Sequence, residues 1–340
     1  MQPVTAPSYG WRCWVAENVL LGVPDDQIAS RAAAAGLDVE LVREELRRTK
    51  NDPYIEAGRW VAQRLRKQES MLQIRVELAR QNAASPVRVP VRTALGADEF
   101  RRLFYARNRP VKLSGMIRHW PAMARWTPEY LRETYGRQMV EITASRNSDP
   151  KYEINLERHR RKIRLAEFVD LATSPVSGND SYLVANNRFF RNPQNAGLLQ
   201  DIGPLPGYLR EQEREERTYL WFGPAGTVTP LHHDTVNILL FQIYGKKRIV
   251  LIPPDETPWL YNELAVYSEV DFENPDFGRY PLFHHVAPIE VIAGPGDALF
   301  IPVGWWHHVR SLETSISVSS TNFAFPNDYH WCQPHIRRST

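Results

Sequence analysis

The feature that most limits the fold of this chain is a series of short β-type segments in its C-terminal two thirds. These segments are rich in β-branched and aromatic residues, and turns containing Gly or Pro separate them. Short strands joined by such turns are typical of a sandwich or a barrel. The predicted strands cover residues 111–113, 139–143, 182–185, 219–222, 238–243, 247–252, 290–292, 298–301 and 315–322. We therefore predict a mainly β fold for this part of the chain.

The first 82 residues have a different texture, because their apolar positions recur at helical spacing. One helix is predicted to end near Gly36, another to start at Asp38, and a long one to cover 54–82. A proline-punctuated extended linker follows at 83–92. The sequence thus predicts an α-helical region over 1–85, a β domain over 86–326 and a short tail over 327–340.

Charge and cysteine content limit the partners and the compartment. The chain has 42 Lys and Arg against 39 Asp and Glu, an excess too small to indicate nucleic acid or an anionic membrane as the main partner. Its two cysteines, Cys13 and Cys332, cannot build a disulfide framework or a Cys-based zinc site. The N-terminus lacks the pattern of a signal peptide, and no apolar run is long enough for a membrane span. We expect a cytoplasmic protein without a membrane partner.

Two histidine pairs and an aspartate point to metal chemistry. Residues i and i+2 of a strand share a face, so His232 and Asp234 can point into a barrel together while His233 points away. His307 and His308, placed at the end of a later strand, are the candidates for a third ligand. An isolated His-x-Asp is common by chance, but two imidazoles and one carboxylate form the facial triad of non-haem Fe(II) oxygenases.

From about residue 89 to 325 the chain resembles the JmjC-type cupin oxygenases, in particular the cupin-like branch that contains the asparaginyl hydroxylase of the hypoxia pathway. The order and spacing of the motifs are those of the family. The matching stretches include NRPVKLSG, SYLVAN, GTVTPLHHD, FQIYGKKRIVLIPPDE and GPGDALFIPVGWWHH. The resemblance implies a double-stranded β-helix of the cupin or jelly-roll type. It also implies Fe(II), with 2-oxoglutarate as co-substrate and dioxygen as oxidant.

The resemblance also implies a role for individual residues. By position, His232, Asp234 and His307 match the metal ligands. Lys247 matches the lysine that pairs with the distal carboxylate of 2-oxoglutarate, a buried dianion that needs a fixed cation. Four more residues match or should line the pocket: Tyr182 and Thr229 at the same carboxylate, Asn322 near the metal-chelating end, and Trp221.

Some of these residues have structural alternatives. Lys247 could end a solvated hairpin, Tyr182 could be a core tyrosine, and Asn322 could cap a strand. The sequence also departs from the family, which often has an Asn six residues after the first metal-binding histidine. Ile238 stands there and Asn237 lies one residue earlier. Either the strand bulges or that contact is absent.

The resemblance implies hydroxylation of an unactivated C–H bond, and its closeness to a side-chain hydroxylase favours a peptide or protein substrate. A biosynthetic oxygenase of a small molecule or natural-product peptide is one alternative, and N-methyl-lysine demethylation is another. A different class is a nucleic-acid or protein-binding module, because residues 25–46 loosely resemble a helix-turn-helix with Arg31, Arg43, Arg47 and Arg48. The hydroxylase's C-terminal dimerisation helices have no counterpart here. We therefore expect a homodimer to use the N-terminal helices, whose other roles would be docking or scaffolding.

Overall fold

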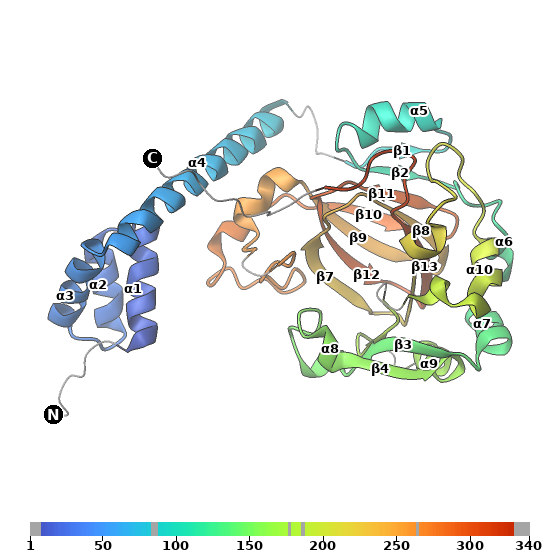
Figure 1. Ribbon diagram of the computed structural model, residues 1–340, viewed down its shortest axis with the longest axis horizontal. Helices are drawn as coiled ribbons and strands as arrows, with labels where there is room; N and C mark the ends of the chain where they lie inside the picture. The colour runs from blue at the N-terminus through green and yellow to red at the C-terminus, as the bar shows by residue number, and fades with distance from the viewer. Residues whose placement is uncertain (1–7, 83–87, 176–177, 185–187, 263–264, 330–340) are drawn as a thin grey trace. The chain divides into compact units, whose positions relative to one another are not determined.

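The computed structural model describes residues 8–82, 88–175, 178–184, 188–262 and 265–329. The chain divides into two units, Met1–Asn82 and Ala83–Thr340 (Figure 1). The predicted linker at 83–92 and tail at 327–340 lie only partly within the described residues. In the described part, no helix is long and apolar enough to cross a membrane.

The first unit consists of four helices, as the sequence predicts. They are α1 (Tyr9–Leu21), α2 (Asp25–Ala34), α3 (Val39–Lys50) and α4 (Pro53–Asn82). Asp38 caps α3, because its carboxylate accepts hydrogen bonds from the amides of Glu40 and Leu41. A small apolar core joins the helices. Its fully or nearly buried members are Val15, Val19, Ile28, Ala29, Ala32, Val42 and Leu46.

The second unit is built on two facing sheets, which form the predicted double-stranded β-helix (Figure 1). The larger sheet has the order β1-β2-β11-β8-β13-β6 and the smaller one β10-β9-β12-β7. Neighbouring strands pair antiparallel except β1 and β2. The bounds are β1 (Val91–Arg92), β2 (Val111–Leu113), β6 (Thr218–Gly223), β7 (Val228–His233), β8 (Ile238–Tyr244), β9 (Lys247–Ile252), β10 (Ile289–Ala293), β11 (Ala298–Ile301), β12 (Trp306–Ser311) and β13 (Ser315–Ser320).

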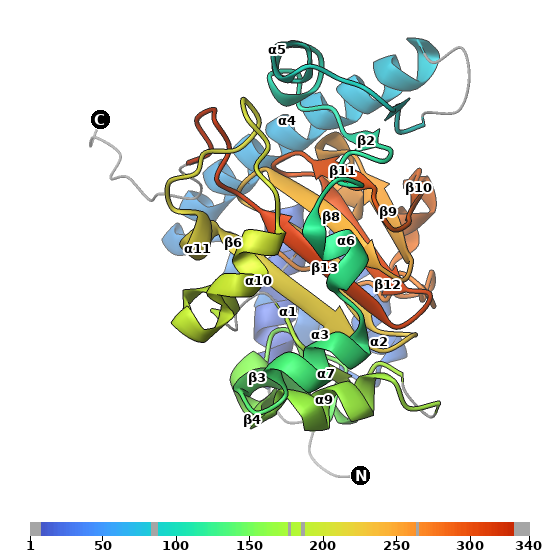
Figure 2. The same ribbon diagram turned by 90° about the vertical axis from the view of Figure 1, so that its right-hand side faces the viewer.

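Short helices and a third sheet surround the β-helix. Figure 2 looks onto the larger sheet, with α6 and α10 in front of its strands. The third sheet has the order β4-β3-β5. The remaining bounds are β3 (Met139–Ala144), β4 (Arg160–Arg164), β5 (Ser181–Tyr182), α5 (Ala97–Phe100), α6 (Pro121–Arg125), α7 (Pro128–Tyr135), α8 (Leu156–His159), α9 (Leu165–Ala172), α10 (Ala196–Asp201) and α11 (Arg214–Arg217). The main apolar core lies between the larger sheet and these helices.

The structure corrects the placement of the downstream histidine pair. The sequence put His307 and His308 at the end of a strand, whereas β12 begins at Trp306 and continues to Ser311. The turn before it needs Gly304, whose φ of 79° is in the left-handed region that favours glycine. The strand β4 escaped prediction, because four of its five residues are basic and give no alternation of apolar and polar positions.

Candidate metal centre

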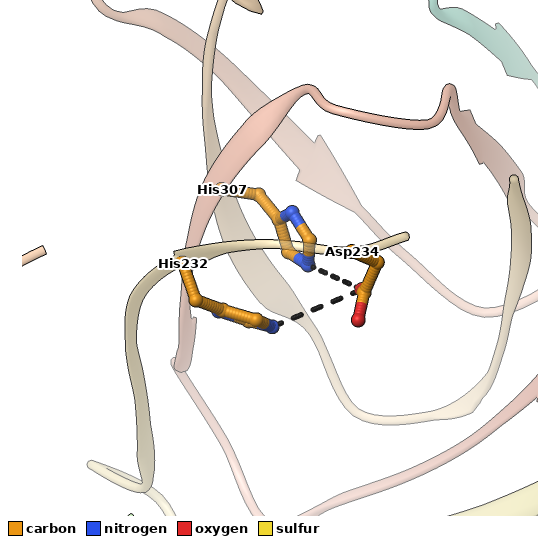
Figure 3. Close-up of side chains that lie close together, drawn as sticks. All are labelled: His232, Asp234 and His307. Atoms are coloured by element: carbon orange, nitrogen blue, oxygen red, sulfur yellow. Dashed lines mark ion pairs between the residues drawn. The ribbon is translucent and has the colours of Figure 1, made fainter. Parts of the chain in front are cut away.

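The strands β7 and β12 bring three candidate metal ligands together (Figure 3). The two strands pair antiparallel, which places His307 opposite His232. Asp234 is the residue directly after the end of β7. The ligand atoms of the three side chains lie within 4.8 Å of one another. The Oδ2 atom of Asp234 is 3.3 Å from Nε2 of His307 and 3.9 Å from Nε2 of His232. The two strands therefore place two nitrogens and a carboxylate around one point.

Backbone carbonyls orient both imidazoles. Nδ1 of His232 lies 2.8 Å from the carbonyl oxygen of Pro230, and Nδ1 of His307 lies 3.0 Å from that of Trp305. A carbonyl only accepts, so each Nδ1 carries a proton, and each Nε2 faces Asp234. Burial, helped by His307, lowers the pKa of His232 to about 4, so this ring is neutral near pH 7. Neutral imidazoles and a carboxylate are the donors of a non-haem Fe(II) site.

The adjacent histidines face the other way, as strand alternation requires. The ring of His233 packs edge-on against Trp306, with centroids 4.7 Å apart. The ring of His308 packs on Phe272 at 5.1 Å. Both histidines are buried, but neither lines the cavity beside the triad. Of the downstream pair, His307 is therefore the one that joins His232 and Asp234.

A cavity of about 370 Å³ adjoins the triad and contains four more of the predicted residues. Lys247 is buried, and its Nζ donates a hydrogen bond to the hydroxyl of Tyr182 at 3.0 Å. Burial lowers the pKa of Lys247 to about 7. Thr229 and Trp221 also line this cavity, and the Trp221 ring lies 5.9 Å from that of Tyr182. The cavity thus offers a buried amine and two hydroxyls to an anion beside the metal.

Asn322, predicted to lie near the metal-chelating end, is not among the residues that line this cavity. Its amide donates to the backbone carbonyl of Arg210, and the neighbouring Thr321 lines the cavity instead. Asn237 also stays outside, because its Oδ1 accepts from the amide of Val303 and its Nδ2 donates to Asn327. In the structure, the side chain of Asn237 thus binds neighbouring chain segments and does not line the cavity.

Several residues that line the cavity were not singled out by the sequence analysis, and two of them lie close to the start of β7 or to its histidine. Glu153 and Tyr267 both line the cavity, and the Tyr267 ring lies 5.6 Å from that of His232. Tyr267 forms an isolated bridge with His232, so it is held against the edge of β7. Neither residue belongs to a periodic segment or a motif with known spacing. Only the folded chain brings them to the cavity that the triad lines.

Arg146 lies behind Glu153 and is fully buried. Its Nη2 donates to a carboxylate oxygen of Glu153 at 2.8 Å and to the carbonyl of Val228 at 2.7 Å. Its guanidinium carbon lies 4.1 Å from the ring centroid of Tyr152 and 5.2 Å from that of Tyr182. Arg146 therefore connects the start of β7 to the ring that contacts Lys247.

The fold and the site define the class of this protein. A double-stranded β-helix with a two-histidine, one-carboxylate centre and a neighbouring lysine pocket characterises the JmjC-type cupin oxygenases, which depend on Fe(II) and 2-oxoglutarate. The residues present fit both groups: the triad offers the donors that Fe(II) takes, and Lys247 offers the cation that a dicarboxylate needs. The sequence model described as "cupin-like domain" matches residues 97–327, and the chain belongs to this family.

Several known proteins are similar to this chain. Lysine-specific demethylase 8 of Xenopus tropicalis is 36% identical over 65% of this chain and 50% of its own length. Lysine-specific demethylase JMJ30 of Arabidopsis thaliana is 33% identical over 68% of this chain and 54% of its own. tRNA wybutosine-synthesizing protein 5 of Gallus gallus is 28% identical over 68% of this chain and 76% of its own. The chain spans about half the length of the first two relatives.

Proposed function

We propose that this protein is an Fe(II)- and 2-oxoglutarate-dependent dioxygenase that hydroxylates an unactivated C–H bond on an amino-acid side chain of a peptide or protein. The observation that carries the proposal is the single cavity shared by His232, Asp234, His307 and Lys247. The relatives named as lysine-specific demethylases support a protein substrate.

The residues have separable roles in this proposal. His232, Asp234 and His307 hold Fe(II), which when bound supplies the oxidising power for C–H cleavage from dioxygen and 2-oxoglutarate. Lys247 binds the distal carboxylate of 2-oxoglutarate. The hydroxyls of Tyr182 and Thr229 donate to the same carboxylate and fix its orientation.

Succinate formation tests the reaction without knowledge of the substrate. Protein loaded anaerobically with Fe(II) is given 2-oxoglutarate and air, and slow uncoupled turnover should yield succinate. His232→Ala should yield none, whereas His233→Ala, a matched change at the neighbouring outward-facing residue, should remain active. Succinate from both variants would contradict the proposed centre. So would a lack of succinate from all three proteins.

Peptide pools test the substrate class. A peptide that gains the mass of one oxygen supports side-chain hydroxylation. A second candidate, N-methyl-lysine demethylation, is favoured by the names of two relatives. It would remove one CH₂ per turnover from methylated peptides and release formaldehyde. Oxidation of free metabolites with no change in any peptide would instead support a small-molecule oxygenase.

The charges of α3 argue against the alternative of a helix-turn-helix that binds nucleic acid. Nη1 of Arg43 lies 2.9 Å from a carboxylate oxygen of Glu40, and Nη2 of Arg47 lies 2.7 Å from one of Glu44. These acids on the same helix oppose the approach of phosphates. Duplex DNA should therefore show no salt-dependent binding to the full chain, and a steep salt dependence would revive this alternative.

A further inference from the structure

A fully buried arginine supports the pocket proposed for the distal carboxylate of 2-oxoglutarate. Arg146 does not line the cavity that contains Lys247, Tyr182 and Thr229. It contacts the ring of Tyr182 and the backbone beside Thr229 instead. Burial of a charged group is costly unless partners compensate for the lost water, so the partners of Arg146 indicate its role.

Only one end of the guanidinium is used in the ion pair with Glu153, where Nη2 of Arg146 donates at 2.8 Å. The Nε and Nη1 atoms are buried and have no hydrogen-bond partner among the described residues. Two aromatic rings lie close to the guanidinium, because its carbon is 4.1 Å from the ring centroid of Tyr152 and 5.2 Å from that of Tyr182. Both distances are short enough for a cation–π interaction.

The ring of Tyr182 thus lies near two cations. Nζ of Lys247 donates to its hydroxyl at 3.0 Å and is 5.6 Å from its ring centroid, and Arg146 is the second cation. Burial raises the pKa of the Tyr182 hydroxyl, and the charge of Arg146 is the largest effect that opposes this rise. The field of Arg146 therefore reaches the hydroxyl that is proposed to bind the co-substrate.

Arg146 also binds the free edge of β7. This strand is the last one of the smaller sheet, so backbone groups on its open side need partners outside the sheet. The carbonyl of Val228 accepts from Nη2 of Arg146 at 2.7 Å and from the hydroxyl of Tyr152 at 3.2 Å. The amide of Val228 donates to Oδ1 of Asn179 at 2.8 Å. Since Thr229 is the next residue, these bonds fix the backbone that presents its hydroxyl to the cavity.

We propose that Arg146 is a positioning residue of the 2-oxoglutarate pocket, which holds the hydroxyls of Tyr182 and Thr229 where the distal carboxylate binds. This role rests on the proposed function, because it concerns the co-substrate of that reaction. A planar guanidinium can lie against two rings while its edge donates to two oxygen atoms, whereas the ammonium of a lysine is a compact point charge. The side chain at this position should therefore affect the affinity for 2-oxoglutarate even when its charge is kept.

Calorimetric titration of 2-oxoglutarate into the anaerobic Fe(II)-loaded protein measures binding without turnover. Arg146→Lys keeps a positive charge beside Glu153 but loses the planar contact with the rings. Its dissociation constant for 2-oxoglutarate should rise about tenfold, the lower end of the loss that follows removal of groups orienting metal ligands. Its Fe(II) content should remain that of the wild type. An unchanged dissociation constant would overturn the proposal.

Arg125→Lys is the matched control. Nη1 of Arg125 lies 2.7 Å from the buried carboxylate of Asp201, and neither residue lines the cavity. This variant should bind 2-oxoglutarate as the wild type does. A rise equal to that of Arg146→Lys would mean that loss of any buried arginine pair weakens binding, and the positioning role would be wrong.

A double-variant cycle tests whether Arg146 acts through Tyr182. Tyr182→Phe keeps the ring and removes the hydroxyl. If Arg146 positions that hydroxyl, Arg146→Lys should raise the dissociation constant by a smaller factor in the Tyr182→Phe background than in the wild type. Equal factors in the two backgrounds would overturn the proposal, because Arg146 would then affect binding by another route.

Tyr152→Leu provides a second test if Arg146→Lys does not fold. It removes one ring from Arg146 and one donor from the carbonyl of Val228, and circular dichroism verifies its fold. The dissociation constant should rise about threefold, as expected for loss of a weak cation–π contact, and no rise would contradict the positioning role. A wild type that neither binds 2-oxoglutarate nor forms succinate would contradict the proposed function itself. A wild type that binds it no better than Arg146→Lys would contradict only the role of Arg146.

Discussion

Both faces of strands β7 and β12 carry histidines, but the histidines on the two faces have different surroundings. On the inner face, His232 and His307 share the carboxylate of Asp234, and backbone carbonyls fix their tautomers. On the outer face, His233 and His308 pack against aromatic rings. Burial lowers the pKa of His232 and of His308 to about 4 alike. The pKa therefore does not separate the faces, whereas the carboxylate and the carbonyls do.

The largest effect on succinate formation is expected from variants that remove a ligand residue on the inner face of β7 and β12. Asp234→Ala and His307→Ala each remove a donor atom from the centre. Loss of groups that merely support a metal ligand costs about 10–100-fold in affinity or activity, so loss of the ligand should exceed about 100-fold in succinate formation. Iron analysis of the anaerobic protein should show the same loss. Retention of Fe(II) at full stoichiometry by both variants would contradict the assignment.

Lys247 lines the same cavity as the three ligand residues and is the residue proposed to bind 2-oxoglutarate. Lys247→Met removes a charged hydrogen-bond donor, which contributes about 1.5–3 kcal/mol when its partner is ionic. The KM for 2-oxoglutarate should rise about tenfold to a hundredfold in steady-state succinate assays. Lys247→Arg keeps the charge and should recover part of the affinity. An unchanged KM in the Met variant would exclude contact with the co-substrate.

A variant of Arg146 tests whether the buried ion pair beside the start of β7 stabilises the protein. Arg146→Met leaves the carboxylate of Glu153 buried without the partner that now lies 2.8 Å away. Removal of one member of a buried ion pair typically costs about 3–5 kcal/mol in the free energy of unfolding. Urea denaturation should show a loss of this size. Adding Glu153→Gln should restore part of it, and no restoration would mean that the pair is not the cause.

The sequence identified the inner face because strand alternation and family motifs agree at the same residues. His232, Asp234, His307, Lys247, Tyr182, Thr229 and Trp221 all line one cavity. Asn322 does not line this cavity, whereas Thr321 does, because the side chains of successive residues in an extended segment point to opposite sides. Glu153, Tyr267 and Arg146 come from turn-rich segments, which carry no periodic pattern to indicate where their side chains point. Their positions depend on long-range packing.

The buried amine of Lys247 should also make the ligand-free protein sensitive to pH. Burial lowers its pKa from 10.5 to about 7, so between these values the unfolded chain binds more protons than the folded chain. The contribution of Lys247 to the free energy of unfolding should therefore increase as the pH rises from about 7 to about 10.5. Denaturation of wild type and Lys247→Met over this range measures the difference. Parallel curves for the two proteins would show that Lys247 does not titrate in this way.

The smallest expected effect is on the outer face. His308 is buried with an Nδ1 that has no hydrogen-bond partner among the described residues, and its ring packs against Phe272. A buried polar group without a partner costs about 1–3 kcal/mol, so His308→Phe should leave the free energy of unfolding unchanged or raise it. Succinate formation should stay within about twofold of the wild type. His307→Phe, one residue away, should abolish it. Loss of Fe(II) in His308→Phe would mean that the outer face supports the metal, and the distinction between the two faces would not hold.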